Sequence, residues 1–257
     1  MKKIAGEHRI FNLKHSRAIQ QDWGYQGQRL PAFPNEIKET VDWRPHNWAP
    51  CNQGRTGTCV GNALSGLLQC QTGKILSRMQ IWGNAVMNDP WDQTVPGALG
   101  DGTSLKTALD CMRKTGAVLE KDWHFYPYES WYEGTGDELR AESAKYRIDS
   151  YYNLGQDQEL WKLWLSNYGP IYIAINVDVS YSTADKTGIL KPYKSSPIYG
   201  GHAIYCCGYT LINDIFYFIW PGSWGLEFGN RGVVFADTEY ASHVQEVYGV
   251  ITGVNRD

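Results

Sequence analysis

The pattern of apolar and polar positions is clearest in the middle of the chain. From Cys59 to Thr72, apolar residues recur at the i, i+3, i+4, i+7 spacing of a helix with one buried face, and Gly73 is a typical helix end. The glycine-punctuated loop 53–58 comes before this segment, and its last residue, Thr58, is a candidate N-cap. The pattern therefore predicts a helix that begins at Cys59.

Two further helices are predicted, followed by a series of strands. The first begins near Leu105, after Thr103 or Ser104, and ends at Gly116, and the second spans about 157–168. Short β-rich runs then follow, separated by Gly, Pro, Asn and Asp, at 171–177, 202–209, 215–220, 232–236 and 247–252. Helices first and strands afterwards predict an α+β protein with two segregated halves.

The start of the chain differs from the rest. Residues 1–40 are polar and contain a Gly-rich, Pro-containing stretch, which indicates an N-terminal extension or short propeptide-like segment. The domain proper is expected at 41–257, with a helical half at about 50–130 and a β-rich half at about 145–257.

Charge and apolar run length exclude several classes of function. The formal net charge is −3, and Lys and Arg are scattered without a basic run, so we expect no nucleic-acid binding. No uninterrupted apolar stretch approaches the roughly 18 residues of a membrane span, and the N-terminus has no signal-peptide apolar region. We therefore expect no membrane insertion, and a protein that is cytoplasmic or exported by a route without an N-terminal signal peptide.

The cysteines favour a reducing compartment. Their spacing is irregular, and there is no C-x-x-C pair, so we expect mostly free thiols and no metal site. The six are Cys51, Cys59, Cys70, Cys111, Cys206 and Cys207.

Among these six, Cys59 has the sequence context of a nucleophile. It opens a predicted helix, whose unpaired N–H groups and dipole favour a thiolate. A cysteine in a helix is otherwise more often a small packing residue. The loop before it changes that interpretation, because Gly54 and Gly57 allow it to fold back and bring the Gln53 amide to the Cys59 N–H.

At this point the sequence resembles the papain family of cysteine peptidases. Residues 52–60 (NQGRTGTCV) resemble the family's N-Q-G-x-C-G-S-C-W nucleophile motif, and 201–209 (GHAIYCCGY) are similar to its histidine segment. Residues 223–232 (SWGLEFGNRG) resemble its S-W-G-x-x-W-G-x-x-G block, and 41–45 (VDWRP) look like the start of the mature domain, particularly in bacterial members. Four motifs in the family's order make the resemblance specific.

The resemblance implies a fold and a set of catalytic roles. The fold is two-lobed and papain-like, with a helical half, a β-barrel-like half and an active-site cleft between them. Cys59 would attack the acyl carbon, His202 would act as base and acid, and Gln53 with the Cys59 N–H would bind the oxyanion. Without the cysteine motif, His202 would be read as a structural residue. No cofactor and no metal are implied.

Substrate contacts are also implied by the resemblance. Gly57, Gly201 and Trp224 would border the substrate site, with Trp224 shielding the histidine from water. Gly102 ends a Gly-rich stretch, 97–102, that is a counterpart of the family's substrate-binding segment or an ordinary surface loop. The expected partner is a peptide or protein substrate. Self-inhibition by the N-terminal segment, lying on the surface or in part of the cleft, is a further expectation.

Three positions depart from the family pattern. The family places an Asn that orients the histidine directly before Ser-Trp-Gly, and here that position is Gly222. The imidazole must use a backbone carbonyl, water or a distant residue, or go without an orienting group. Thr56 replaces a cysteine that forms a disulfide in secreted members, and Val60 replaces an aromatic residue.

The expected function is hydrolysis of peptide bonds through a thioacyl intermediate on Cys59. Two alternatives keep the fold. One is a peptide- or partner-binding module with weak or no proteolysis, and the other is a peptide ligase or transamidase that uses the same Cys-His dyad. The 11 Trp and 17 Tyr also raise an aromatic platform for glycan or peptide binding. No family motif or helical face accounts for Trp23, Trp48, Trp82, Trp91, Trp123 and Trp131.

Overall fold

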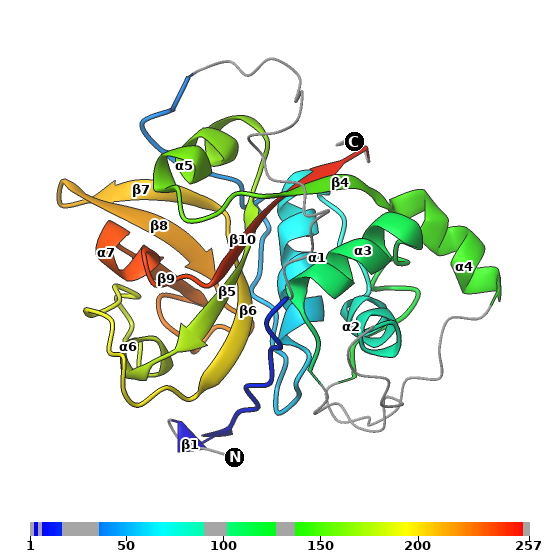
Figure 1. The fold of residues 1–257 in the computed structure, drawn as a ribbon, viewed down its shortest axis with the longest axis horizontal. Helices are drawn as coiled ribbons and strands as arrows, with labels where there is room; N and C mark the ends of the chain where they lie inside the picture. Colours follow the sequence, from blue (N-terminus) through cyan, green and yellow to red (C-terminus); the bar gives the residue numbers. More distant parts are fainter. Residues whose placement is uncertain (1–2, 5–6, 17–35, 90–101, 127–136, 254–257) are drawn as a thin grey trace.

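A computed structural model describes residues 3–4, 7–16, 36–89, 102–126 and 137–253, which are arranged as two lobes (Figure 1). The helical lobe contains α1 (Cys59–Thr72), α2 (Arg78–Met87), α3 (Leu105–Lys114) and α4 (Asp137–Ser143), and a 3₁₀ turn at Ala144–Tyr146 follows α4. The other lobe is rich in strands and also carries α5 (Gln158–Asn167), α6 (Val179–Ser182) and α7 (Thr238–Ala241).

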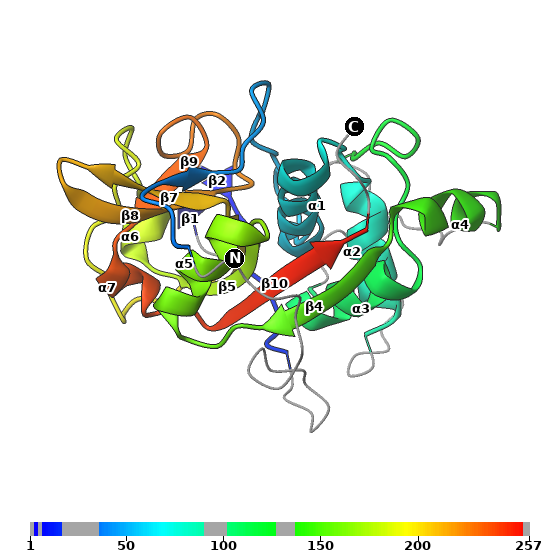
Figure 2. The ribbon, with the colours of Figure 1, turned by 90° about the horizontal axis from the view of Figure 1, so that it is seen from above.

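Two antiparallel four-stranded sheets build the strand-rich lobe. The first has the order β4 (Ile148–Asn153), β10 (Glu246–Thr252), β5 (Ile171–Val177), β6 (Gly200–Cys206). The second has the order β3 (Val41–Asp42), β7 (Gly208–Ile212), β8 (Ile215–Pro221), β9 (Val233–Ala236). A separate pair, β1 (Lys3–Ile4) and β2 (Glu7–His8), lies near the N-terminus. β4 and β10 extend from the strand-rich lobe toward the helical lobe (Figure 2).

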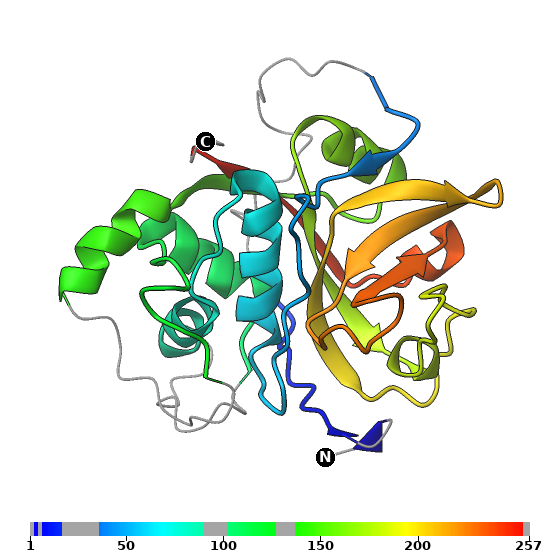
Figure 3. The ribbon, with the colours of Figure 1, turned by 180° about the vertical axis from the view of Figure 1, so that it is seen from behind.

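Helix α1 lies between the two lobes and is buried around its whole circumference (Figure 3). A Cβ at Gly61 would lie 2.3 Å from the Arg78 carbonyl oxygen, and one at Gly66 would lie 2.6 Å from the Tyr205 ring. These two glycines let α2 and β6 approach the helix closely from different sides. The sequence predicts one buried face, and the second lobe covers the rest.

The core of the strand-rich lobe is built on tryptophans from α5. Trp161 and Trp164 are fully buried, and the Trp161 ring lies 5.7 Å from that of Phe218 in β8. A Cβ at Gly249 in β10 would lie 2.3 Å from the Trp164 ring, so only glycine fits there. The helix predicted at about 157–168 is thus confirmed, and one of its faces packs into the core.

The helices and strands that the sequence pattern predicts are confirmed, with one strand divided in two, and the structure adds further elements to them. α1, α3 and α5 match the expected helices, and α1 ends at Gly73, whose φ is 74°. The run 202–209 is divided at Cys207, where the chain passes from the first sheet to the second. α2 and β4 are among the elements that the sequence pattern does not predict. α2 contains Gly83 and Asn84, which are weak helix formers. In β4, apolar and polar residues alternate clearly only at the two ends of the strand.

Two further findings concern the chain as a whole. No helix within the described ranges has the length and apolarity needed to cross a membrane. All six cysteines lie in described parts of the chain, and each is a free thiol.

Candidate active site

Cys59 is the first residue of α1 and is fully buried at the junction of the lobes. Burial raises the pKa of the Cys59 thiol to about 11, and the backbone N–H groups of Ala203, Val60 and Cys59 itself act in the opposite direction. The sulfur therefore faces both the start of α1 and Ala203 in β6. Because Ala203 follows His202, the fold brings the predicted nucleophile and base to the same place.

The start of α1 differs from its prediction in one detail. Thr58 occupies the N-cap position but makes no capping hydrogen bond with its side chain. Its hydroxyl instead pairs with that of Thr56 at 2.7 Å and accepts from the Asn62 amide at 2.9 Å. The first N–H groups of the helix are consequently not taken up by a threonine, and those of Cys59 and Val60 act on the sulfur.

The Gln53 side chain is held at both ends of its amide. Its Nε2 donates to the Thr56 carbonyl at 2.8 Å, and its Oε1 accepts from the Ser223 hydroxyl at 2.5 Å. The Gln53 backbone N–H also donates to the Ser223 carbonyl at 2.9 Å. The amide nitrogen carries two hydrogens, and the bond to Thr56 uses one of them. Ser223 was not predicted as a site residue, although the motif that contains Trp224 could have indicated it.

His202 lies in β6, opposite Ile175 of β5, and is also fully buried. Burial, and to a smaller extent the positive charge of Arg9, lower the pKa of His202 to about 3. Neither ring nitrogen has a hydrogen-bond partner among the residues that the structure describes. In this state the imidazole is neutral at ordinary pH and the thiol is protonated.

Aromatic rings surround the imidazole. The Trp224 ring lies 5.1 Å from that of His202, Tyr181 lies 5.9 Å away and Phe11 lies 6.2 Å away, measured between ring centroids. Trp224 was predicted to lie there from its motif. Tyr181 in α6 and Phe11 near the N-terminus were not, because neither carries a motif and both are distant in sequence. Gly222 supplies no side chain to this group, so the orienting role that the resemblance implies is vacant at that position.

Residues 9–16 run between the two lobes, along the side of the molecule where the N-terminus lies (Figures 1 and 3). On the strand-rich side, the Leu13 N–H donates to the Gly201 carbonyl at 3.4 Å. On the helical side, the Lys14 N–H donates to the Thr103 carbonyl at 3.1 Å. This N-terminal segment, 9–16, therefore bridges the lobes through its backbone.

Two of the glycines predicted to bind substrate contact this N-terminal segment. A Cβ at Gly102 would lie 1.7 Å from the Asn12 carbonyl oxygen, and one at Gly201 would lie 2.9 Å from that of Leu13. The structure thus brings Gly102 and Gly201 to opposite sides of one extended segment. Gly57 is buried in the loop before Cys59. The rest of the Gly-rich stretch, 97–101, lies outside the described residues.

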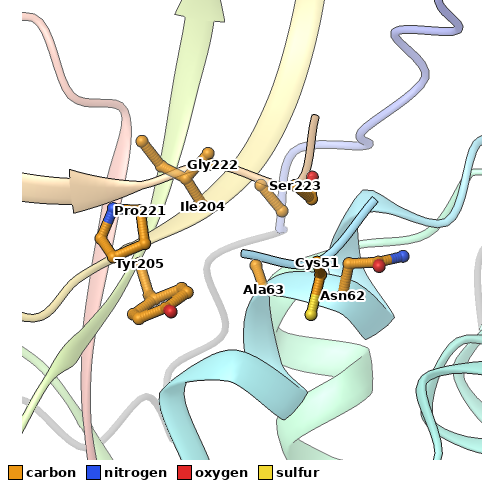
Figure 4. A pocket seen from close by; sticks show the side chains of 9 residues that line it. Cys51, Asn62, Ala63, Ile204, Tyr205, Pro221, Gly222 and Ser223 are labelled. Atoms are coloured by element: carbon orange, nitrogen blue, oxygen red, sulfur yellow. The ribbon is translucent and has the colours of Figure 1, made fainter. Parts of the chain in front are cut away.

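A small cavity lies beneath the site, between α1, β6 and the end of β8 (Figure 4). Its volume is about 10 Å³, which is room for one water molecule and not for a peptide. Its lining comes from Cys51, Asn62, Ala63, Ala203, Ile204, Tyr205, Pro221, Gly222 and Ser223.

The tryptophans left unplaced by the sequence are partly accounted for. Trp82 is buried in the helical lobe, Trp48 is half-buried and donates to the Tyr205 hydroxyl at 3.0 Å, and Trp123 packs on the cluster around Trp82. Trp23, Trp91 and Trp131 lie outside the described residues. The three described side chains have packing roles, and none is fully exposed.

A cysteine at the start of a buried helix and a histidine in a strand of the other lobe are typical of the papain-like class of α+β folds. The chain belongs to the papain family of cysteine proteases, because the family model "Papain family cysteine protease" matches residues 37–248. The fold and family expected from the sequence are thereby confirmed.

Individual relatives agree with this assignment. A viral cathepsin of Choristoneura fumiferana nuclear polyhedrosis virus is 30% identical over 231 residues, covering 81% of this chain and 66% of the relative's own length. Xylellain, a cysteine protease from Xylella fastidiosa, superimposes with a TM-score of 0.78 over 98% of each chain at 21% identity. Procathepsin B S9 from Trypanosoma congolense gives 0.72 over 96% of this chain and 88% of its own at 14% identity. The two structural matches show the shared fold.

Proposed function

We propose that the protein is a cysteine endopeptidase that hydrolyses peptide bonds through a thioacyl intermediate on Cys59. The observation that carries this proposal is the position of the Cys59 sulfur, which faces the N–H groups at the start of α1 and the residue that follows His202. A helix N-terminus favours the thiolate, and a neighbouring imidazole can hold the proton that the thiol releases.

The chemical steps follow from the residues present. The Cys59 thiolate attacks the carbonyl carbon of the scissile bond, and the protonated His202 delivers its proton to the departing amine. His202, now neutral, takes a proton from water, which attacks the thioester and releases the acid and the Cys59 thiolate. The Gln53 Nε2 and the Cys59 N–H donate to the oxyanion in both steps. Ser223 holds the Gln53 amide in the required orientation.

We also propose that the described state is latent, with the N-terminal segment as an inhibitor in cis. Gly102 and Gly201, predicted to bind substrate, contact Asn12 and Leu13 instead. Phe11 and Arg9 cover the Trp224 ring, with the Arg9 guanidinium carbon 4.4 Å from a Trp224 ring centroid. Covered in this way, Cys59 and His202 are both uncharged, so the reactive thiolate–imidazolium pair forms only after the segment leaves.

The segment is anchored at its far end as well. The Ser16 N–H donates to Glu246 Oε1 at 2.7 Å, and the Lys106 N–H donates to the Ser16 hydroxyl at 3.3 Å. Leu13, between these anchors and the site, is buried in the main core cluster. A charged residue at position 13 should therefore weaken the contact, because burial of a leucine side chain contributes about 1.5–3 kcal/mol.

The test is to label the full-length protein with a peptidyl epoxide, an electrophile with a peptide backbone, and to identify the modified cysteine by mass spectrometry. We expect labelling at Cys59 alone, about tenfold or more faster in Leu13→Asp than in wild type. The matched control is Leu211→Asp, at an exposed position in β7, which should label at the wild-type rate.

Equal labelling of several cysteines would contradict the assignment of Cys59 as nucleophile. Equal rates for wild type and Leu13→Asp would instead contradict the inhibitory role of the N-terminal segment. Product masses from a peptide substrate complete the test, because hydrolysis releases two fragments whereas a ligase or transamidase joins them.

A further inference from the structure

We propose that Tyr181 positions the His202 imidazole for catalysis, in place of the side chain that Gly222 lacks. Its hydroxyl would bind the imidazole nitrogen that faces away from Cys59. This inference rests on the proposed function, since it gives one more residue a role in the same reaction.

The space beside Gly222 is already filled from elsewhere in the chain. A Cβ at Gly222 would lie 3.0 Å from two ring carbons of Phe228 and 3.4 Å from the Tyr181 hydroxyl oxygen. The Gly222 backbone is held in place, since its N–H donates to the Gly232 carbonyl at 2.9 Å. The Tyr181 hydroxyl therefore occupies the region that a longer side chain at position 222 would enter.

Tyr181 is held rigidly in that position. Its backbone N–H donates to Asp178 Oδ1 at 2.8 Å, which caps the short helix α6. The same carboxylate accepts from the Tyr240 hydroxyl and from the Lys194 N–H, so it is fixed by three partners. The Tyr181 ring packs 5.1 Å from each of the Trp224 and Phe228 rings. The hydroxyl is thus presented to the site by a fully buried, well-packed side chain.

The Tyr181 hydroxyl and the His202 imidazole both lack a hydrogen-bond partner among the described residues. Within the described part of the chain, neither the Tyr181 hydroxyl nor either His202 nitrogen has a hydrogen-bond partner, and all three atoms are buried. Buried polar groups without partners are unfavourable and uncommon, so two such residues side by side indicate a bond that forms in another state. Their ring centroids are 5.9 Å apart and the rings meet edge to face, so the two residues are direct neighbours in the core.

The chemistry of a phenol suits both protonation states of the histidine. A hydroxyl accepts a hydrogen bond from the N–H of an imidazolium and donates one to the bare nitrogen of a neutral imidazole. Burial raises the pKa of Tyr181 well above its usual value, so the hydroxyl keeps its proton throughout the working pH range. Tyr181 would accordingly stabilise the imidazolium, and through it the Cys59 thiolate.

The test compares single hydroxyl deletions in the full-length protein carrying Leu13→Asp, which opens the site. Tyr181→Phe should lower kcat by about tenfold to a hundredfold with KM little changed, because a hydrogen bond to a charged group has that value. In the pH profile of kcat/KM, the acidic limb should move to higher pH and the alkaline limb to lower pH, since the ion pair is less stable. Tyr209→Phe is the matched control: Tyr209 is buried in β7, its hydroxyl binds Ser166 and Lys38, and the profile should not move.

Adding Gly222→Asn to Tyr181→Phe should restore part of the lost kcat, because the amide then supplies an acceptor where the hydroxyl lay. Unchanged kcat and unchanged pH limbs in Tyr181→Phe would overturn the positioning role. Loss of thermal stability in Tyr181→Phe and Tyr209→Phe alike, with the same kcat and pH limbs as the parent, would show that the hydroxyl is only structural and overturn it too. Absence of any Cys59-dependent hydrolysis in the parent would overturn the proposed function itself.

Discussion

The two sides of the candidate active site are built in different ways. On the cysteine side, most polar contacts join residues a few positions apart, such as Gln53 to Thr56 and Thr58 to Asn62. On the histidine side, β6, α6 and the loop 222–228 meet from separate parts of the chain, and residues 9–11 cover them. A local motif fixes the nucleophile, whereas long-range packing fixes the base. A residue on the histidine side can therefore be replaced if a residue from another segment makes the contact that is lost.

The largest expected effect is on the histidine side. His202→Ala should lower kcat/KM for peptide hydrolysis by at least about 10³-fold in the Leu13→Asp protein, because both the thiolate and the leaving amine depend on the imidazole. Steady-state kinetics with a fluorogenic peptide measures this. His243→Ala, at a histidine that stacks on Tyr193 away from Cys59, should change kcat/KM less than twofold. A similar loss in both variants would remove His202 from the mechanism.

A smaller effect is expected on the cysteine side, at the oxyanion. Gln53→Ala should lower kcat about 10²- to 10³-fold, which is the usual effect of removing one oxyanion donor. Alkylation of Cys59 by iodoacetamide forms no oxyanion, so its rate should stay close to that of the parent. Ser223→Ala, which loses only the bond that orients Gln53, should show a milder loss. If Gln53→Ala slows alkylation and hydrolysis equally, Gln53 supports the loop and not the oxyanion.

The smallest effect concerns the stability of the folded protein. The histidine side and the cysteine side of the site should give this stability opposite dependences on pH. The folded protein holds the pKa of His202 at about 3, below its ordinary 6.5, so the unfolded chain binds the extra proton first. The unfolding free energy should thus fall as pH decreases from 6.5 toward 3. The pKa of Cys59 is raised from 9.0 to about 11, so its contribution is complete below pH 9 and is lost as pH rises toward 11.

Urea unfolding of the full-length protein across this pH range measures both slopes. His202→Gln should flatten the acidic side, and Cys59→Ala should flatten the alkaline side. The Leu13→Asp protein should show weaker slopes on both sides, because water then reaches the two groups. Acid slopes that are identical in wild type and His202→Gln would show that carboxylates, and not this histidine, set the acid sensitivity.

Some elements of the fold can be predicted because neighbouring residues determine them, whereas others depend on contacts with distant parts of the chain. α1, α3 and α5 are legible in the sequence because each carries apolar residues at helical spacing with a clear stop, such as Gly73 after α1. α2 carries Gly83 and Asn84, and packing against α1 at Gly61 stabilises it in spite of them. β4 is held by pairing with β10, nearly 100 positions later in the chain, which no local pattern reveals.

By itself, the sequence determined the family and predicted a candidate nucleophile at the start of a helix, the glutamine six positions before it and a candidate base. Each of these depends on contacts within one turn or loop, or on a contiguous motif. Only the tertiary structure decided that the N-terminal segment lies against both Gly102 and Gly201, and that Tyr181 lies beside Gly222. These contacts join residues far apart in the chain, and their free energy comes from packing two lobes together, which a local pattern of residues does not encode.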